Sequence, residues 1–136
     1  MTYGPFYPTS LVNESQGGAP WTISGATASA SISGEGVTDF LVATGFNADV
    51  PSDKVVTRTY MRLSPDPTNG GFNIADQYVT GFAGNAYTLG NDAVQCEDAG
   101  MTPSIVNDPS FGFKFSLYAE SGGNVSQSLA LYVDVE

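Results

Sequence analysis

Histidine is absent from the 136-residue chain, and cysteine occurs once, at Cys96. Histidine is the commonest metal ligand and the commonest general base, and a single cysteine cannot form a disulfide within the chain. With no histidine to lower its pKa, Cys96 is expected to be a small buried side chain rather than a nucleophile. The sequence therefore predicts a protein that is not an enzyme and that binds no metal ion and no cofactor.

Basic residues are also scarce. Four Lys and Arg stand against 14 Asp and Glu, and the net charge of -10 disfavours contact with the phosphates of DNA or RNA. Charged residues make up 13% of the chain, about half the ~25% of an ordinary soluble domain, so we expect a largely neutral polar surface. No apolar run approaches the ~20 residues of a membrane span, and the first ten residues lack the pattern of a secretory signal. We expect a soluble protein with no nucleic-acid and no membrane partner.

What the chain has is an alternation of apolar and polar residues with a period of two, interrupted by 16 glycines and eight prolines. Such stretches, recurring at intervals of about ten residues, are typical of antiparallel strands. The predicted strands are 28–33, 39–46, 54–63, 77–82, 85–89, 93–96, 111–118 and 129–135. The fold class that follows is all-β, an antiparallel β-sandwich of jelly-roll-like type.

The ends of the chain differ in pattern. Residues 1–17 show little alternation and predict an extended N-terminal arm, which leaves a single sandwich domain at 18–136. The last two predicted strands are joined by 120–124, whose Gly and Asn tolerate positive φ, and we expect a hairpin there. We expect the arm to order against a neighbouring protein, where it buries apolar side chains. The arm residues with this role are Tyr3, Phe6, Tyr7 and Leu11.

Phe111, Phe113 and Phe115 occupy alternate positions of one predicted strand. Exposed aromatic residues at this spacing can stack on sugars or bases. The intervening residues include Lys114 and Ser116, however, and one apolar face with one polar face is the ordinary pattern of a half-buried strand. We therefore expect the phenylalanines to lie in the core.

Two groups of acidic residues suggest other sites. Asp92, Glu97 and Asp98 are close in sequence and could include a pair for glycoside hydrolysis or ligands for calcium, and Asp66 with Asn69 could also bind calcium. Neither stretch has the spacing of a known site. Solvated loops are the expected structure at both places.

Three of the four basic residues, Lys54, Arg58 and Arg62, are four residues apart in one predicted strand. They would form a stripe with neighbours roughly 13 Å apart, with Tyr60 between the two arginines. On an acidic chain this stripe could contact an acidic neighbour, such as a second copy of the protein. The alternative is a solvated face on which these residues pair with the chain's own carboxylates.

Several stretches in order resemble a β-sandwich domain found in tailed-bacteriophage virion and tail-associated proteins. They are a G-x-x-W opening, a strand with a G-F bulge and a P-S step, a T-P-x-x-V-N step, and a closing strand of alternating apolar residues. In this sequence they are GAPW at 18–21, TDFLVATGFNADVPSDKVV at 38–56, MTPSIVNDPSFGF at 101–113 and LALYVDVE at 129–136.

The resemblance implies a structural role in a virion and no catalytic residues. A decoration or cement protein that binds the major capsid protein is the first hypothesis. It would be a homo-oligomer, with a trimer favoured, made in the host cytoplasm and located on the capsid surface. The arm would dock on a neighbour, and the stripe would fix the register between subunits.

The second hypothesis is a tail, baseplate or fibre-associated module that binds a host-surface glycan. It requires exposed aromatic residues, for which the candidates are Phe72, Tyr78, Phe82 and Tyr87. A third, a secreted bacterial carbohydrate-binding module, would require a signal peptide that the first residues do not resemble.

Overall fold

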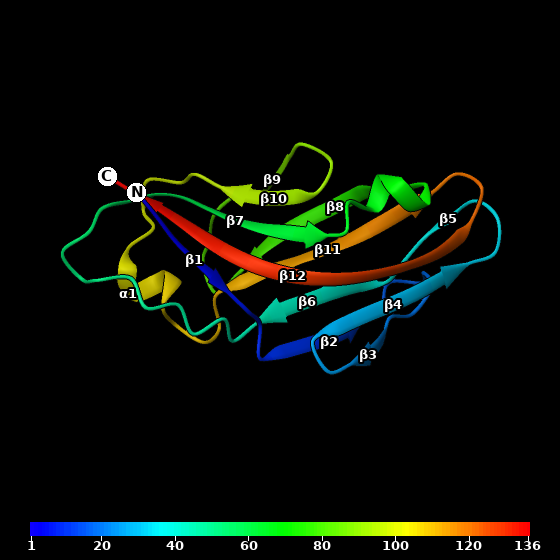
Figure 1. The fold of residues 1–136 in the computed structure, drawn as a ribbon, viewed down its shortest axis with the longest axis horizontal. Coiled ribbons are helices and arrows are strands. Elements are labelled where there is room, and N and C mark those ends of the chain that lie inside the picture. The colour runs from blue at the N-terminus through cyan, green and yellow to red at the C-terminus, as the bar shows by residue number, and fades with distance from the viewer.

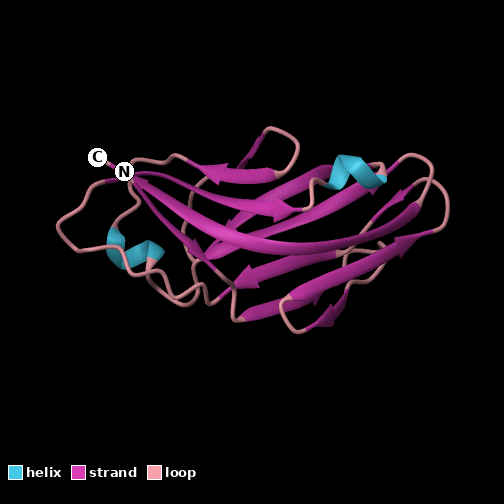
Figure 2. Cartoon of the chain, in the orientation of Figure 1, coloured by secondary structure: helices cyan, strands magenta, loops and turns pink.

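The computed structural model describes residues 1–136, which form two antiparallel sheets packed face to face (Figure 1). Strands make up nearly all of the regular structure, with two short helical turns, η1 (Pro67–Gly70) and α1 (Pro103–Val106), at the ends of the sandwich (Figure 2). The predicted all-β sandwich is confirmed. The jelly-roll connectivity stays a prediction.

Sheet A has seven strands, and the long strand β12 (Gly123–Val135) runs through its middle. On one side β12 pairs with β4 (Thr27–Ile32), which continues to β3 (Thr22–Ser24), and with β1 (Thr2–Phe6). On the other side it pairs with β7 (Val56–Ser64), followed by β10 (Ala93–Cys96) and β9 (Tyr87–Leu89). Its 13 residues give β12 enough length to pair with three neighbours.

Sheet B has five strands centred on β11 (Gly112–Ala119). One side of β11 pairs with β8 (Phe72–Thr80), and the other pairs with β6 (Phe40–Thr44) and β5 (Gly36–Val37). The outer strand β2 (Ser10–Glu14) pairs with β6. Six of the predicted strands agree with the observed bounds to within two residues, namely 28–33, 39–46, 54–63, 85–89, 93–96 and 111–118.

The two sheets share one hydrophobic core, in which 26 buried residues form a single connected cluster. Phe111, Phe113 and Phe115 are fully buried in it, as predicted, and the ring of Phe115 packs edge-on against Trp21. Cys96 is also buried there. No helix of the structure has the length and apolar character needed to cross a membrane.

The predicted hairpin at 120–124 is wrong. Although the chain turns there, β11 belongs to sheet B and β12 to sheet A, so the loop carries the chain from one sheet to the other. Gly122 has a positive φ of 75°, and a Cβ at this position would lie 2.6 Å from the carbonyl oxygen of Ile32. The glycine therefore permits a close crossing over the neighbouring loop, which turn chemistry alone cannot distinguish from a hairpin.

The N-terminal segment is also not a free arm. Residues 2–6 form β1 against β12, and residues 10–14 form β2 against β6, so the first 17 residues contribute a strand to each sheet. The two termini meet, because the backbone N–H of Val135 donates to the carbonyl of Met1 at 2.9 Å. A boundary at 17/18 therefore separates strands that share the same sheets.

A buried carboxylate fixes the segment between β2 and β3. Asp39 accepts hydrogen bonds from the backbone N–H groups of Gln16 (3.0 Å) and Gly18 (2.9 Å) and from the side chain of Asn13 (3.1 Å). These bonds, led by that from Gln16, lower the pKa of Asp39. The indole N–H of Trp21 donates to the Asp39 carbonyl at 2.8 Å. The stretch at 18–21 is thereby held against the start of β6.

A second contact joins the long loop after β6 to α1. The side chain of Asn107 accepts from the N–H of Val50 and donates to its carbonyl, both at 2.9 Å. A single amide thus satisfies both backbone groups of Val50. Two of the stretches that carry the family resemblance, 38–56 and 101–113, contact each other at this point.

Candidate functional site

The outer face of sheet A carries a row of aromatic and basic side chains from β7 and β12. In β7, Thr59, Met61 and Leu63 point into the core, so Arg58, Tyr60 and Arg62 point outward. The pairing register places each opposite an outward residue of β12. The pairs are Arg58 with Asp134, Tyr60 with Tyr132, Arg62 with Ala130 and, one step further, Ser64 with Ser128.

Tyr60 lies at the centre of this row. Its ring stacks on Tyr132 with a centroid separation of 5.1 Å and an interplanar angle of 14°. The guanidinium carbons of Arg58 and Arg62 lie 4.8 Å and 5.7 Å from its centroid, within the range of cation–π attraction. The four side chains therefore form one connected surface cluster.

Both arginines are paired with carboxylates of the same chain. Arg58 contacts Asp134 at 2.8 Å through Nη2, with a further bond from Nε at 3.0 Å, and Arg62 contacts Asp92 at 3.0 Å. The predicted stripe is shorter than expected, because Lys54 lies in the loop before β7, where its N–H donates to Pro51. The sequence left two alternatives for these arginines, contact with an acidic neighbour or pairing with the chain's own carboxylates. The structure shows the second.

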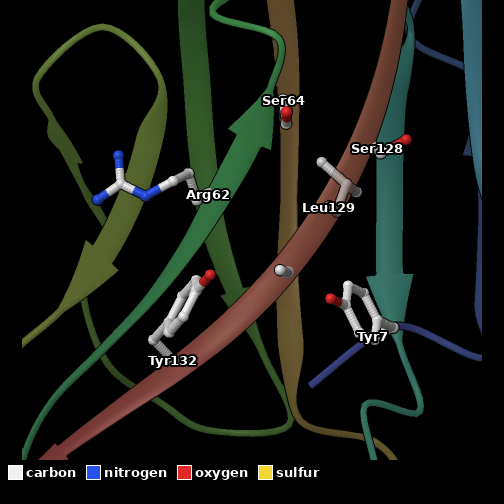
Figure 3. Close-up of a pocket in the computed structure, with 7 residues that line it drawn as sticks. Tyr7, Arg62, Ser64, Ser128, Leu129 and Tyr132 are labelled. Atoms are coloured by element: carbon white, nitrogen blue, oxygen red, sulfur yellow. The ribbon is translucent and has the colours of Figure 1, made fainter. Parts of the chain in front are cut away.

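A groove of about 320 Å³ opens on this face, beside the stacked pair. Figure 3 shows Tyr132 and Arg62 on one side and Tyr7 on the other, with Ser64 and Ser128 further along the strands. Leu129 and Ala130 of β12 complete the lining. The groove thus combines two tyrosine rings with serine hydroxyl groups, whereas the guanidinium of Arg62 points away from it (Figure 3).

The four candidate interface residues of the N-terminal segment have different environments. Tyr3, Phe6 and Leu11 are partly buried and pack against the core, because β1 and β2 turn these side chains inward. Tyr7, in the link between the two strands, remains 64% exposed. Of the four, Tyr7 is therefore the one whose ring is mostly free for contact with another molecule.

The outer face of sheet B holds a second cluster, which we call the sheet B face: Val12, Phe40, Val42, Tyr78 and Lys114. Val12, Val42, Lys114 and Tyr78 lie in one register line across β2, β6, β11 and β8. Phe40 meets Tyr78 edge-on at 5.7 Å, and the Lys114 ammonium lies 4.9 Å from the Phe40 ring and 2.6 Å from a Glu14 oxygen. Val12 and Tyr78 are about half exposed, at 52% and 50%.

Three of the four acidic candidates have structural partners, whereas Glu97 is exposed. Asp92 pairs with Arg62, and Asp98 accepts the N–H of Asn85 at 2.7 Å, whereas Asp66 caps η1 by accepting the N–H of Thr68. No group of three or more His, Cys, Asp or Glu side chains is arranged to hold a metal ion. Asp66, Asp92 and Asp98 therefore stabilise turns and strand contacts.

Cys96 is buried, and burial is the main cause that raises the pKa of its thiol. The adjacent Asp98 carboxylate adds to the shift by its negative charge. A thiol with a raised pKa is a poor nucleophile at neutral pH. The prediction of a buried Cys96 side chain is confirmed.

The four aromatic candidates for glycan contact differ in burial. Phe72 is fully buried, and Phe82 packs against the core, whereas Tyr78 and Tyr87 are exposed on β8 and β9.

Sequence reasoning missed Tyr132, Ser64 and Ser128. Tyr132 could have been found as the outward residue between Leu131 and Val133, but its contact with Tyr60 depends on the pairing of β12 with β7.

Comparison with protein-family models and with curated proteins finds no match to this chain.

Proposed function

We propose that this chain is a structural protein of a bacteriophage virion, namely a head decoration or cement protein that binds the major capsid protein and stabilises the head. Support comes from the stretches that resemble the phage sandwich domain. They hold the loops of this fold together through Asp39 with Gly18, and through Asn107 with Val50. The residues shared with the phage domain therefore make contacts that hold this fold together. Such contacts would not be expected if the resemblance were only a chance similarity of turn sequences.

The observation that carries the proposal is the sheet B face. It is an uncovered sheet surface on which Val12, Val42 and Tyr78 lie in one register line, with Lys114 between Val42 and Tyr78. Tyrosine and phenylalanine are enriched in the centres of protein interfaces, and burying their apolar area contributes about 25 cal/mol per Å². We infer that this face contacts the major capsid protein and that the ion pair of Lys114 with Glu14 is part of the contact.

The proposal no longer uses the N-terminal segment as a docking arm. Because β1 and β2 belong to the two sheets, Tyr3, Phe6 and Leu11 stabilise the subunit itself. Arg58 and Arg62 are likewise neutralised within the chain, so they offer little attraction to an acidic neighbour. The expected trimer would instead place three subunits around a shared contact on the capsid, each docked through its sheet B face.

The test uses virions that carry this chain and a double variant, Val12→Asp with Tyr78→Asp. Placing two carboxylates on the sheet B face should lower occupancy on the capsid at least tenfold, since carboxylates are costly to bury in an interface. Tyr87→Asp is the matched control, because Tyr87 is similarly exposed, at 53%, but belongs to sheet A. Occupancy is measured by quantitative mass spectrometry against the major capsid protein.

Each variant is first checked for folding by circular dichroism. A folded double variant that remains at full occupancy would exclude the sheet B face as the docking surface. Absence of the parent chain from purified virions would exclude the virion role altogether.

The second candidate function is a tail, baseplate or fibre-associated module that binds a host-surface glycan. The observation that favours it is the groove between Tyr7 and Tyr132, which has aromatic sides and polar groups within reach. Copy number separates the two candidates, because a decoration protein is present in hundreds of copies per particle and a tail module in a handful.

A further inference from the structure

We propose that the groove on the outer face of sheet A binds a neutral saccharide. The inference rests on the side chains that line the groove, and it holds whether the chain belongs to a phage head or a tail. A saccharide ring offers apolar C–H faces together with hydroxyl groups. A matching site therefore needs aromatic surface and a few well-placed polar groups.

The aromatic part of the site consists of Tyr7 and Tyr132. Stacking on Tyr60 holds the Tyr132 ring in place, and Gly4 approaches that ring so closely that a Cβ on it would lie 3.3 Å from Cδ1 of Tyr132. A ring fixed before binding loses little conformational entropy when a ligand arrives. Tyr7, 64% exposed, borders the other side of the groove and can close on the opposite face of a bound sugar.

The polar part of the site consists of Ser64 and Ser128. The two serines are exposed register partners on β7 and β12, so their hydroxyls lie on the same side of the sheet. The guanidinium of Arg62 points away from Tyr7 and the two serines (Figure 3) and donates to Asp92 at 3.0 Å. The two serine hydroxyls are therefore the donors and acceptors available for the hydroxyl groups of a sugar.

The charges around the groove favour a neutral ligand. No carboxylate lines it, and the positive charge of Arg62 is balanced by Asp92 at 3.0 Å. An anionic saccharide would be repelled by a chain of net charge -10. The volume of about 320 Å³ lies at the lower end of the range of about 300–1,000 Å³ for small-molecule sites, which suits a short saccharide segment.

The test is titration of the ¹⁵N-labelled protein with neutral tetrasaccharides of glucose, mannose, galactose and N-acetylglucosamine, followed by amide chemical shifts. At least one is expected to bind and to shift the amides of Ser64, Ser128 and Tyr132. A tetragalacturonate of the same length is the anionic comparison and is expected to bind at least tenfold more weakly. Free tetrasaccharides are compared with polysaccharide chains of the same sugar, to distinguish a soluble ligand from a surface glycan.

Variants assign the binding to the groove. Tyr7→Ala should weaken binding at least fivefold, as expected for loss of one stacking ring, whereas Tyr87→Ala on the same sheet should leave it within twofold. The proposal is overturned if none of the four neutral tetrasaccharides binds at 10 mM sugar, about the weakest binding expected of such a site. It is also overturned if both tyrosine variants bind equally well, or if the anionic sugar binds as tightly as the neutral ones. Capsid occupancy of the sheet B face variants does not depend on this result, so the two proposals can fail separately.

Discussion

The rings of Tyr60 and Tyr132 stack 5.1 Å apart across the pairing of β7 with β12. Arg58 and Arg62 lie over the Tyr60 ring, and each is paired with a carboxylate of the same chain. The outer face of sheet A is therefore pre-formed and nearly neutral. The outer face of sheet B, by contrast, has half-exposed apolar side chains, and we assign the two faces to different ligands.

Replacing both rings should reveal a coupling free energy between Tyr60 and Tyr132. Aromatic pairs contribute about 0.5–1.5 kcal/mol beyond the area they bury, so a double-mutant cycle with Tyr60→Leu and Tyr132→Leu should give a coupling in that range. Urea unfolding of the four proteins measures it. A cycle that pairs Tyr60 with Tyr78, in the other sheet, serves as control and should give none. Equal coupling in both cycles would contradict the stacked arrangement.

The stability of the fold should depend on pH through Asp39. Hydrogen bonds from Gln16, Asn13 and Gly18 lower the pKa of its carboxyl below the ordinary value of 3.8. A group with a depressed folded-state pKa adds stability above its unfolded pKa, and this contribution is lost as the pH falls through the folded value. Asp39→Asn should therefore have a lower Tm than the parent at pH 7, and its Tm should fall less between about pH 4 and pH 2.

Thermal unfolding monitored by circular dichroism at several pH values tests this. Asp53→Asn, a change at an exposed loop residue, should retain the acid dependence of the parent. Parallel Tm curves for Asp39→Asn and the parent below pH 4 would contradict the assignment.

Asn107→Ala should destabilise the protein by about 2 kcal/mol, because it leaves both backbone groups of Val50 without their partner. Denaturant unfolding measures the change in the free energy of unfolding. Asn91→Ala, at an exposed turn, is the control and should change it by less than about 0.5 kcal/mol. A loss as small as that of the control would mean that the loop at 45–55 is held by other contacts.

Ser116→Ala should be neutral or stabilise the protein by up to about 1 kcal/mol. The Ser116 hydroxyl is buried and has no hydrogen-bond partner, so removing it relieves the cost of its desolvation. Ser126→Ala, which removes an exposed hydroxyl bonded to Ser29, provides the comparison. Destabilisation by more than 1 kcal/mol at Ser116 alone would show that its hydroxyl has a partner in solution.

Deletion of residues 1–9 should impair folding rather than simply release a tether. It removes β1, whose Tyr3 and Phe6 pack against the core, and leaves one edge of β12 unpaired. We expect a lower Tm and increased aggregation, because an open strand edge promotes association. A truncated chain with the Tm of the parent would restore the view of this segment as an independent arm.

Alternation of apolar and polar residues predicted the class of the fold and the buried row Phe111, Phe113 and Phe115, because a half-buried strand has a period of two. Pairing between distant strands was not predictable in the same way. The glycine-rich link at 120–124 has the chemistry of a hairpin, yet it joins two sheets. The N-terminal segment shows little alternation of apolar and polar residues and therefore predicts an arm, although it pairs with both sheets as β1 and β2.

The candidate sites also depend on strand pairing that the sequence does not predict. Arg58, Tyr60 and Arg62 share an outward face, as the spacing predicted, but their ion-pair partners Asp92 and Asp134 belong to other strands. The groove and the sheet B face each combine residues from separate strands or loops. No local pattern marks such sites, so they become visible after strand order and register are known.

The copy number of this chain in purified virions tests the central claim most directly. Quantitative mass spectrometry against the major capsid protein measures it without any variant. A head decoration protein is predicted to be present in hundreds of copies per particle, in a fixed ratio to the major capsid protein. Absence from the particle, or a handful of copies, would contradict the assignment to the head.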